Sequence, residues 1–349
     1  MTAELSRDQT VALPRDCTFH ARDWQILARQ WHPVALVRDV VDQPLAATLL
    51  DQPLVVYRAG EEIVVANDLC PHRGMPLSLG SGDGERIQCA YHGLQFGPGG
   101  ACVRIPADPE AKIPNRMHLA SYPAVERYGL VWTCLSPAPG GPAVPVMKNW
   151  DAPGFQQINC PPFDVAAFAG RQVEGFLDVA HFAFTHSNTF ADPGNPVVPS
   201  YNPTTTDYGF EVDYWSTVSN YPHGSGKTAP DGFQWLRHFE MYLPFTATIT
   251  IHFPDEALLT IMNAASPVSA KKTRMFAPIA RNFDTDRPVQ EVYDFNQRVF
   301  EEDRTMVESQ KPENLPLDPR IEVNIAADRS SVALRRGLRS LGLSEFFTA

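Results

Sequence analysis

Short apolar runs broken by glycine, proline and aspartate dominate the first part of the chain. Residues 20–31 have the spacing of a short helix. Over residues 32–132 apolar runs alternate with turn residues, as in PLVVYRAGEEIVVAND, where Ala59-Gly60 predicts a hairpin turn. This pattern predicts a small antiparallel β domain. The proline- and glycine-rich stretch 136–145 indicates a link to a second domain.

The second part of the chain carries longer elements. Residues 164–186 have mainly the periodicity of a helix, residues 208–283 alternate strand-like runs with turns, and residues 287–310 are helical again. A basic amphipathic helix, SSVALRRGLRSLG, follows near the end. Because helices and strands are segregated along the chain, the second domain is predicted to be α+β, with an antiparallel sheet flanked by helices.

These patterns predict two domains in a chain of 349 residues. The first is a β domain over residues 25–140, and the second is an α+β domain over residues 141–349. Residues 1–24 are expected to form an extension that packs on either domain.

The composition narrows the range of functions. It is 44% hydrophobic and 20% charged, as in ordinary globular proteins, and the net charge is −11. That charge argues against general binding of nucleic acids or anionic membranes, because both need basic patches. No apolar run reaches the roughly 18 residues of a membrane span. The N-terminal sequence lacks the pattern of a signal peptide, so a cytoplasmic location is expected.

Four of the 6 cysteines stand apart from any motif and are expected to be buried thiols rather than disulfides. They are Cys17, Cys102, Cys134 and Cys160.

Two short clusters of metal-binding side chains lie in the predicted β domain, Cys70-x-His72 and Cys89-x-x-His92. A set of two cysteines and two histidines is most often a zinc site, but zinc fingers pair cysteine with cysteine and histidine with histidine. Here each cluster is mixed. Mixed clusters suit a two-iron centre in which the cysteines hold one iron and the histidines the other.

The stretch resembles the Rieske motif, with sixteen residues between His72 and Cys89. In respiratory Rieske proteins each loop carries an additional cysteine that forms a disulfide. Met75 and Tyr91 occupy those places here. The loops therefore resemble the oxygenase and ferredoxin branch, and a ferredoxin would leave some 200 residues unexplained.

A second candidate site lies in RQVEGFLDVAHFAFTH, residues 171–186. On a helix, Glu174, Asp178, His181 and Thr185 would share one face. His186 lies five residues after His181, which does not suit one face of a straight helix. Both histidines can reach one metal only if the helix distorts or ends between them.

The helix predicted at 287–310 supplies a carboxylate. The residues of its mostly apolar stripe are Val292, Asn296, Val299, Asp303 and Met306. The residues expected on its solvated side are Asp294, Arg298, Glu301 and Glu308. Asp303 therefore points inward and needs a partner. Two histidines and one carboxylate with open positions form the facial triad of non-haem Fe(II) oxygenases.

With these features the chain resembles, over nearly its whole length, the catalytic subunit of Rieske non-haem iron oxygenases. The resemblance implies a [2Fe-2S] cluster and a mononuclear Fe(II). The implied cluster ligands are Cys70, His72, Cys89 and His92, and the implied iron ligands are His181, His186 and Asp303. Asp178 would be the catalytic bridge to a cluster histidine. Many members have an asparagine where this chain has Gly175.

The family implies a homotrimer in which the cluster of one subunit serves the iron of its neighbour through Asp178. Electrons would come from a separate flavin and iron–sulfur reductase, or through a ferredoxin. The substrates would be O2 and a small aromatic or heteroaromatic compound. No nucleic acid or membrane partner is expected.

The motifs of this chain resemble those of one group within the family. This group contains methylxanthine N-demethylases, vanillate and dicamba O-demethylases and saxitoxin hydroxylase. We expect a monooxygenase that removes methyl groups as formaldehyde, from N rather than O. Hydroxylation without dealkylation and ring dihydroxylation are the alternatives. A carrier with two irons per chain, or a binding protein without catalysis, would be non-oxygenase alternatives.

The substrate pocket is expected between the sheet and the irregular segment 187–203. Four residues on strand-like runs could orient a substrate, although a structural role is favoured for each. They are His238, Phe245, His252 and Asn263.

Overall fold

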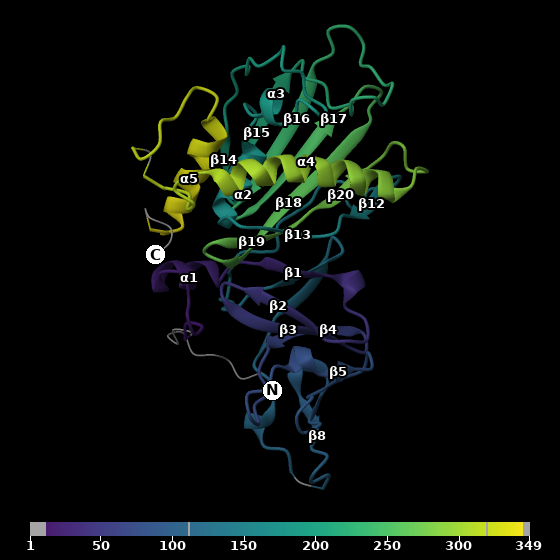
Figure 1. Cartoon of the computed structure of the whole chain (residues 1–349), viewed down its shortest axis with the longest axis vertical. Helices are drawn as coiled ribbons and strands as arrows, with labels where there is room; N and C mark the ends of the chain where they lie inside the picture. The colour runs from purple at the N-terminus through teal and green to yellow at the C-terminus, as the bar shows by residue number, and fades with distance from the viewer. Residues whose placement is uncertain (1–11, 111, 319, 345–349) are drawn as a thin grey trace. The chain divides into compact units, whose positions relative to one another are not determined.

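A computed structural model describes residues 12–110, 112–318 and 320–344 (Figure 1). The chain divides into two compact units, Met1–Val144 and Pro145–Ala349. Within the described ranges no helix has both the length and the apolar character needed to cross a bilayer.

The first unit contains one short helix, α1 (Ala21–Leu27), and three small antiparallel sheets. One sheet has the order β1 (His32–Leu36), β11 (Leu130–Thr133), β10 (Ala124–Arg127). The next has the order β2 (Leu45–Leu49), β3 (Gln52–Ala59), β4 (Glu62–Asn67), β9 (Ser121–Tyr122). The last has the order β5 (Ser81–Gly82), β6 (Ile87–Gln88), β7 (Gln95–Phe96), β8 (Cys102–Arg104). Four 3-10 turns connect them: η1 (Val37–Asp39), η2 (Leu77–Leu79), η3 (Pro98–Gly100) and η4 (Asn115–Met117).

The predicted hairpin joins β3 and β4. Ala59 pairs with Glu62, so the turn is Gly60-Glu61, one residue later than expected. Gly60 has a φ of 68°, a conformation that glycine adopts without strain. The two strands bury alternate apolar side chains in a core that also contains the Cys70 and Cys89 side chains. The β core thus supports the loops that carry the first motif.

The described part of the N-terminal extension contacts the first unit. The Trp24 indole donates to the carbonyl of Leu50 at 2.8 Å, and Thr18 donates to the carboxylate of Asp51. Residues 1–11 lie outside the described residues. The helix predicted over residues 20–31 is the shorter α1.

The second unit is built on a nine-stranded antiparallel sheet, which confirms the α+β class. Its main order is β12 (Gln156–Asn159), β20 (Pro278–Arg281), β18 (Leu258–Ser269), β17 (Thr246–His252), β16 (Trp235–Tyr242), β15 (Gly209–Ser216), β14 (Thr204–Thr206). β13 (Phe163–Val165) pairs with β19 (Lys272–Phe276), which pairs with β18. The helices are α2 (Ala169–Leu177), α3 (Phe182–Thr185), α4 (Val289–Ser309) and α5 (Arg329–Ser340). The long helix α4 crosses one face of the sheet (Figure 1).

Residues 164–186 were predicted to be mainly helical, and they contain two helices with an interruption between them. After β13, α2 ends at Leu177 and α3 begins at Phe182. Asp178 has an extended backbone (φ −74°, ψ 135°), and its Oδ1 accepts the N–H of Ala180 at 2.8 Å. An aspartate side chain that binds the backbone two residues later offers an alternative to the helical hydrogen bond. The interruption therefore follows from Asp178 itself.

The inward stripe of α4 also differs from the prediction at its end. Val292 and Asn296 are buried as expected, but the last buried residue is Val307, and Met306 is exposed. Glu308 was placed on the solvated side, yet its Oε1 accepts the backbone N–H of Ala166 at 2.8 Å. The straight-helix pattern missed this contact because it depends on a strand entering from elsewhere in the chain.

Candidate metal centres

The two cysteine–histidine loops of the first unit have the same backbone geometry. In one, Gly74 N–H donates to Cys70 O at 2.9 Å, and Cys70 N–H donates to Met75 O at 2.8 Å. In the other, Gly93 N–H donates to Cys89 O at 3.0 Å, and Cys89 N–H donates to Leu94 O at 2.8 Å. The glycines have φ values of 72° and 70°. Each loop can therefore turn tightly enough to present one cysteine and one histidine.

The four side chains converge. Cys70 and Cys89 are buried, and burial together with the neighbouring Cys89 thiol raises the pKa of Cys70. The rings of His72 and His92 lie 4.5 Å apart between centroids. His72 Nδ1 is buried and has no hydrogen-bond partner in the described part of the chain. A buried, unpaired imidazole nitrogen beside two thiols and a second imidazole fits a [2Fe-2S] cluster with two sulfur and two nitrogen ligands.

The second centre is built on the two ends of the short helix α3. His181 precedes the first turn of α3 and His186 follows its last, so both side chains can approach one point. Their Nε2 atoms lie 3.1 Å apart. Asp303 Oδ1, from α4, lies 3.5 Å from His181 Nε2 and 3.1 Å from His186 Nε2. The expected break between the two histidines is not found, because Thr185 N–H donates to His181 O and His186 N–H donates to Phe182 O. The helix ends at His186 instead, and the three donor atoms lie within 4.8 Å of one another.

Each histidine is oriented by a carboxylate on its other nitrogen. His181 Nδ1 donates to Asp178 Oδ2 at 3.2 Å, and His186 Nδ1 donates to Glu302 Oε2 at 2.8 Å. The Thr189 hydroxyl donates to the same Glu302 oxygen at 2.9 Å. A carboxylate on Nδ1 leaves Nε2 as the metal ligand and fixes the ring. His181, His186 and Asp303, called the triad below, therefore have the orientation that a metal needs.

Glu302 was missed by the sequence reasoning. Phe295, Val299 and Glu302 are spaced i, i+4 and i+7 along α4, so all three share one face. That spacing was the available signal. The predicted apolar stripe of this helix included the adjacent Asp303. Glu302 lies at the edge of that stripe and was not included.

The electrostatics of the triad favour a cation. Burial opposes charge on His181, but its hydrogen bonds to Asp178 and Asp303 outweigh burial and raise its pKa to about 9. Burial likewise opposes charge on Asp303, but the two histidines hold its pKa below the ordinary value. The pKa of Asp178 is lowered in the same way, since contact with His181 and backbone N–H groups outweighs burial. The site therefore stabilises positive charge between its carboxylates, and the donor set fits a divalent metal.

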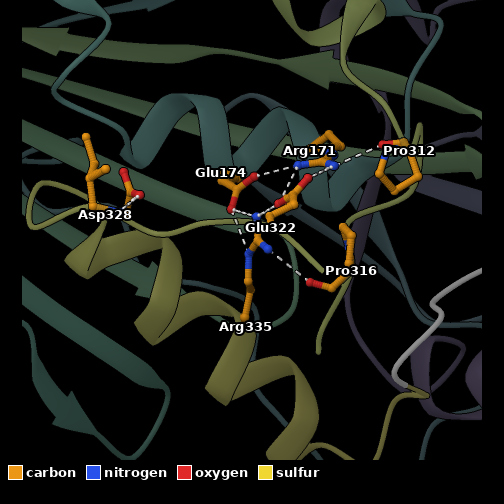
Figure 2. A network of polar contacts seen from close by, with 8 residues as sticks. Arg171, Glu174, Pro312, Pro316, Glu322, Asp328 and Arg335 are labelled. Atoms are coloured by element: carbon orange, nitrogen blue, oxygen red, sulfur yellow. Dashed lines mark hydrogen bonds and ion pairs between the residues drawn. The ribbon is translucent and has the colours of Figure 1, made fainter. Parts of the chain in front are cut away.

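A buried charge network holds α2, the helix that ends at Asp178 (Figure 2). Four charged residues form this network, and we call them the charge network. Two lie on α2, one lies on α5, and one lies in the segment between α4 and α5: Arg171, Glu174, Arg335 and Glu322. Glu174 accepts from Arg335 at 2.6 Å and from Arg171 at 3.1 Å. Arg171 also donates to Glu322 Oε1 at 2.6 Å. Burial raises the pKa of Glu174 despite these two arginines. Glu174 thus has a structural role.

A cavity of about 260 Å³ opens beside the triad. Its wall is largely apolar and contains seven phenylalanines: Phe176, Phe182, Phe190, Phe253, Phe283, Phe295 and Phe300. Gly175 also lines it, and a Cβ atom there would approach Val307 Cγ2 to 3.3 Å. The cavity has the size and character of a site for a small, flat apolar molecule.

The four residues considered as possible substrate contacts do not line the cavity, in keeping with the structural role favoured for each. They are His238, Phe245, His252 and Asn263. Arg237 lines the cavity, and because side chains alternate along β16, His238 faces the opposite side of the sheet. Within 187–203 only Phe190 contributes, whereas a second segment supplies Asn220, Tyr221, Pro222, Ser225 and Lys227.

Arg237 is fully buried and paired. It donates to the Ser216 hydroxyl and to the carbonyl of Val218, both at 2.7 Å, and to the side-chain oxygen of Asn220. At the cavity wall Lys227 pairs with Asp284. Lys227 and Asp284 thus neutralise each other, whereas the guanidinium of Arg237 is hydrogen-bonded to neutral groups.

Two family models match the chain. The Rieske [2Fe-2S] domain matches residues 30–123, and the vanillate O-demethylase oxygenase C-terminal domain matches residues 165–343. Methylxanthine N1-demethylase NdmA from Pseudomonas putida is 32% identical over 91% of this chain and 90% of its own length. The chain belongs to the Rieske non-haem iron oxygenases.

Other relatives of this Rieske oxygenase agree. Subunit TsaM1 of the toluene-4-sulfonate monooxygenase system from Comamonas testosteroni is 30% identical over 80% of this chain and 86% of its own length. The solved structure of NdmA with caffeine has a TM-score of 0.78, with 31% identity and 91% of each chain covered. The Rieske oxygenase is thus an oxygenase component of the kind found in multi-component systems. Its family carries a [2Fe-2S] cluster and a mononuclear iron, and both constellations described above fit these groups.

Proposed function

We propose that this chain is the terminal oxygenase of a monooxygenase system that demethylates a small aromatic or heteroaromatic compound. The observation that carries the proposal is the position of the triad, at the wall of a cavity of about 260 Å³ lined by seven phenylalanines. Aromatic walls hold a planar ring by stacking and edge contacts. A methyl group on that ring can then lie beside the triad.

The similarity to NdmA and to the vanillate O-demethylase domain supports demethylation rather than ring attack. NdmA is named for the removal of a methyl group from nitrogen, and we propose N-demethylation ahead of O-demethylation. Hydroxylation of a carbon without loss of a methyl group is the second candidate. It is supported by the monooxygenase subunit TsaM1, whose name specifies no demethylation.

We assign the cluster to Cys70, His72, Cys89 and His92, and the mononuclear iron to His181, His186 and Asp303. When bound, the iron supplies the activation of O2 and the cluster supplies electrons. Asp178 and Glu302 hold the histidine rings by their Nδ1 atoms. The phenylalanines orient the substrate and keep water away from it.

The proposed demethylation balances in atoms and electrons, and it needs no covalent bond between the substrate and a residue of the protein. One O2, two electrons and two protons convert the N-methyl group to N-hydroxymethyl and yield one water. The carbon–nitrogen bond then breaks, the hydroxyl proton returns to nitrogen, and formaldehyde leaves. Each demethylation therefore consumes one O2 and releases one formaldehyde.

We further propose a cytoplasmic homotrimer served by a separate flavin and iron–sulfur reductase. In a cyclic trimer Asp178 would lie at the subunit interface, between a cluster histidine of one chain and His181 of the next. The side chain of Asp178 is 30% exposed in the single chain, so it is accessible to such a contact.

The test is a substrate screen with the iron-loaded protein and a surrogate reductase. N-methyl, O-methyl and unmethylated aromatics are compared for formaldehyde release and O2 uptake. We expect equal amounts of formaldehyde and O2 with an N-methyl compound. Hydroxylated product without formaldehyde would establish the second candidate. A lack of O2 uptake with every aromatic would contradict both.

A further inference from the structure

A second group of metal-binding side chains lies on the opposite side of the sheet from the cavity. In the pairing of β15 with β16, Glu211 lies opposite Glu240 and Asp213 lies opposite His238. Residues two apart on a strand share a face, so all four side chains project from the same face. Arg237, which lines the cavity, projects from the other face. This group is therefore separate from the triad.

Three of these side chains can contact one ion. One donor atom each of Glu211, His238 and Glu240 lies within 4.8 Å of the others. His238 Nδ1 donates to Asp213 Oδ1 at 2.7 Å, which leaves Nε2 with its lone pair free. His238 Nε2 is buried and accepts from no group in the described ranges. The Asp213–His238 pair repeats the carboxylate–histidine arrangement that orients metal ligands.

Glu240 supplies the independent observation. Its side chain is only 2% exposed. Oε1 accepts from Lys148 Nζ at 3.0 Å and from the hydroxyls of Tyr208 and Tyr242 at 3.2 and 3.3 Å. Oε2 is buried and lacks any hydrogen-bond partner within the described structure. A buried carboxylate oxygen is costly unless a donor or a cation contacts it.

The charges of the group are unbalanced. Three carboxylates, Glu211, Asp213 and Glu240, face one cation, Lys148, which binds the oxygen of Glu240 that is already satisfied. The excess of two negative charges matches a divalent ion.

We propose that Glu211, His238 and Glu240 bind a divalent first-row transition ion. One imidazole and two carboxylates suit Zn²⁺ or Mn²⁺ better than Mg²⁺ or Ca²⁺, which take oxygen ligands. Glu211 is only half-buried, so its carboxylate can move toward the ion and the group is open to solvent. The ion joins β15 to β16 and neutralises the buried carboxylate. This inference does not rest on the proposed function.

The experiment is equilibrium dialysis of the full-length, iron-loaded protein against Zn²⁺, with iron and zinc counted per chain. We expect one zinc to be gained while all iron is retained. We also expect zinc to raise the denaturation midpoint, because an ion that binds only the folded state stabilises it. Zinc that merely replaced the mononuclear iron would appear with an equal loss of iron and would contradict the proposal.

Variants assign the ligands. Glu211→Gln changes a half-buried side chain and leaves the buried Glu240 intact, and it should weaken zinc binding at least tenfold. His238→Gln should do the same. The matched control is Glu256→Gln, an exposed carboxylate in the turn between β17 and β18, which should bind zinc like the parent protein. Circular dichroism checks that each variant is folded. Equal zinc binding by Glu211→Gln and Glu256→Gln would overturn the proposal and leave Lys148 as the counter-ion of Glu240.

Discussion

At the scale of single residues, the triad depends on the groups that hold its histidines. Asp178 and Glu302 each bind the Nδ1 atom of one histidine, and both Nε2 atoms face Asp303. The ligands could be proposed from residue type and spacing. The orienting role of Glu302 could not be proposed, because its partner His186 lies far away in the sequence and only the folded chain brings the two together.

Replacement of Asp178 tests its role as a bridge. Asp178→Asn keeps the size of the side chain but removes its charge and replaces one of its two acceptor oxygens by an NH2 group. His181 therefore loses a charged partner, and the proposed path between subunits loses a carboxylate. We expect both metal centres to remain and turnover to fall about 10–100-fold. Iron content and product formation are the measurements. Wild-type product formation by this variant would exclude the bridging role.

Glu302 and Glu301 form a matched pair on α4. Glu302→Gln removes the charged partner of His186 Nδ1, and we expect the affinity of the mononuclear site for iron to fall about tenfold. Glu301 is exposed and pairs with Arg304 on the surface, so Glu301→Gln should bind iron like the parent protein. Iron retention under a chelator is the measurement. Equal iron loss in the two variants would show that Glu302 does not orient the ligand.

At the scale of elements, the position at which α2 ends determines where Asp178 and the residues after it lie. Asp178 ends the helix by binding the N–H of Ala180, and the short helix α3 that follows carries His181 and His186 at its two ends. The charge network then holds the helix against α5 and the segment around Glu322 (Figure 2). The anchored helix α2 thus positions Asp178, which follows its last residue.

Removal of one member of the charge network should destabilise the second unit. Arg335→Met leaves Glu174 buried without its closest partner, and breaking a buried ion pair costs about 3–5 kcal/mol. The matched control is Arg336→Met, because Arg336 is exposed and its neighbour Arg335 is buried. We expect a change within about 0.5 kcal/mol for the control. Chemical denaturation measures both.

The double variant Glu174→Gln with Arg335→Met separates charge from packing. If the cost arises from an uncompensated carboxylate, its neutralisation should recover part of the lost stability. No recovery would mean that the packing of the Arg335 side chain, rather than its charge, holds α2.

At the scale of the whole molecule, the chain combines an electron-accepting unit and an oxygen-activating unit. The Rieske family model matches the first unit and the oxygenase model matches the second, and NdmA matches across both. The proposed trimer makes the two units of one chain serve different neighbours. That arrangement can be tested by mixing two inactive variants.

Mixed trimers provide the test. One variant, Cys70→Ala with Cys89→Ala, should lack the cluster, and another, His181→Ala, should lack the mononuclear iron. Each is inactive alone. When the two are co-expressed in equal amounts, a head-to-tail trimer restores one working junction in every mixed trimer, which predicts about a quarter of the wild-type activity. Mixed trimers without activity would place electron transfer within one chain.

The sequence by itself determined much about this protein. The mixed cysteine–histidine loops, the two histidines after Asp178 and the inward carboxylate Asp303 identified the family, because metal chemistry restricts both residue type and spacing. The segregation of strands and helices determined the α+β class. Each of these features is a pattern of residue types along the sequence. Such a pattern can be recognised without knowing which distant residues it contacts.

The tertiary structure decided what depends on separate segments meeting. It placed Glu302 on His186, Glu308 on the backbone of Ala166, and Arg335 on Glu174. It also showed that Arg237 and the residues around Asn220 line the cavity, whereas His238 and His252 do not. The physical reason is that a side chain on a strand points to one of two faces, and only the packing of the sheet decides which face borders the cavity.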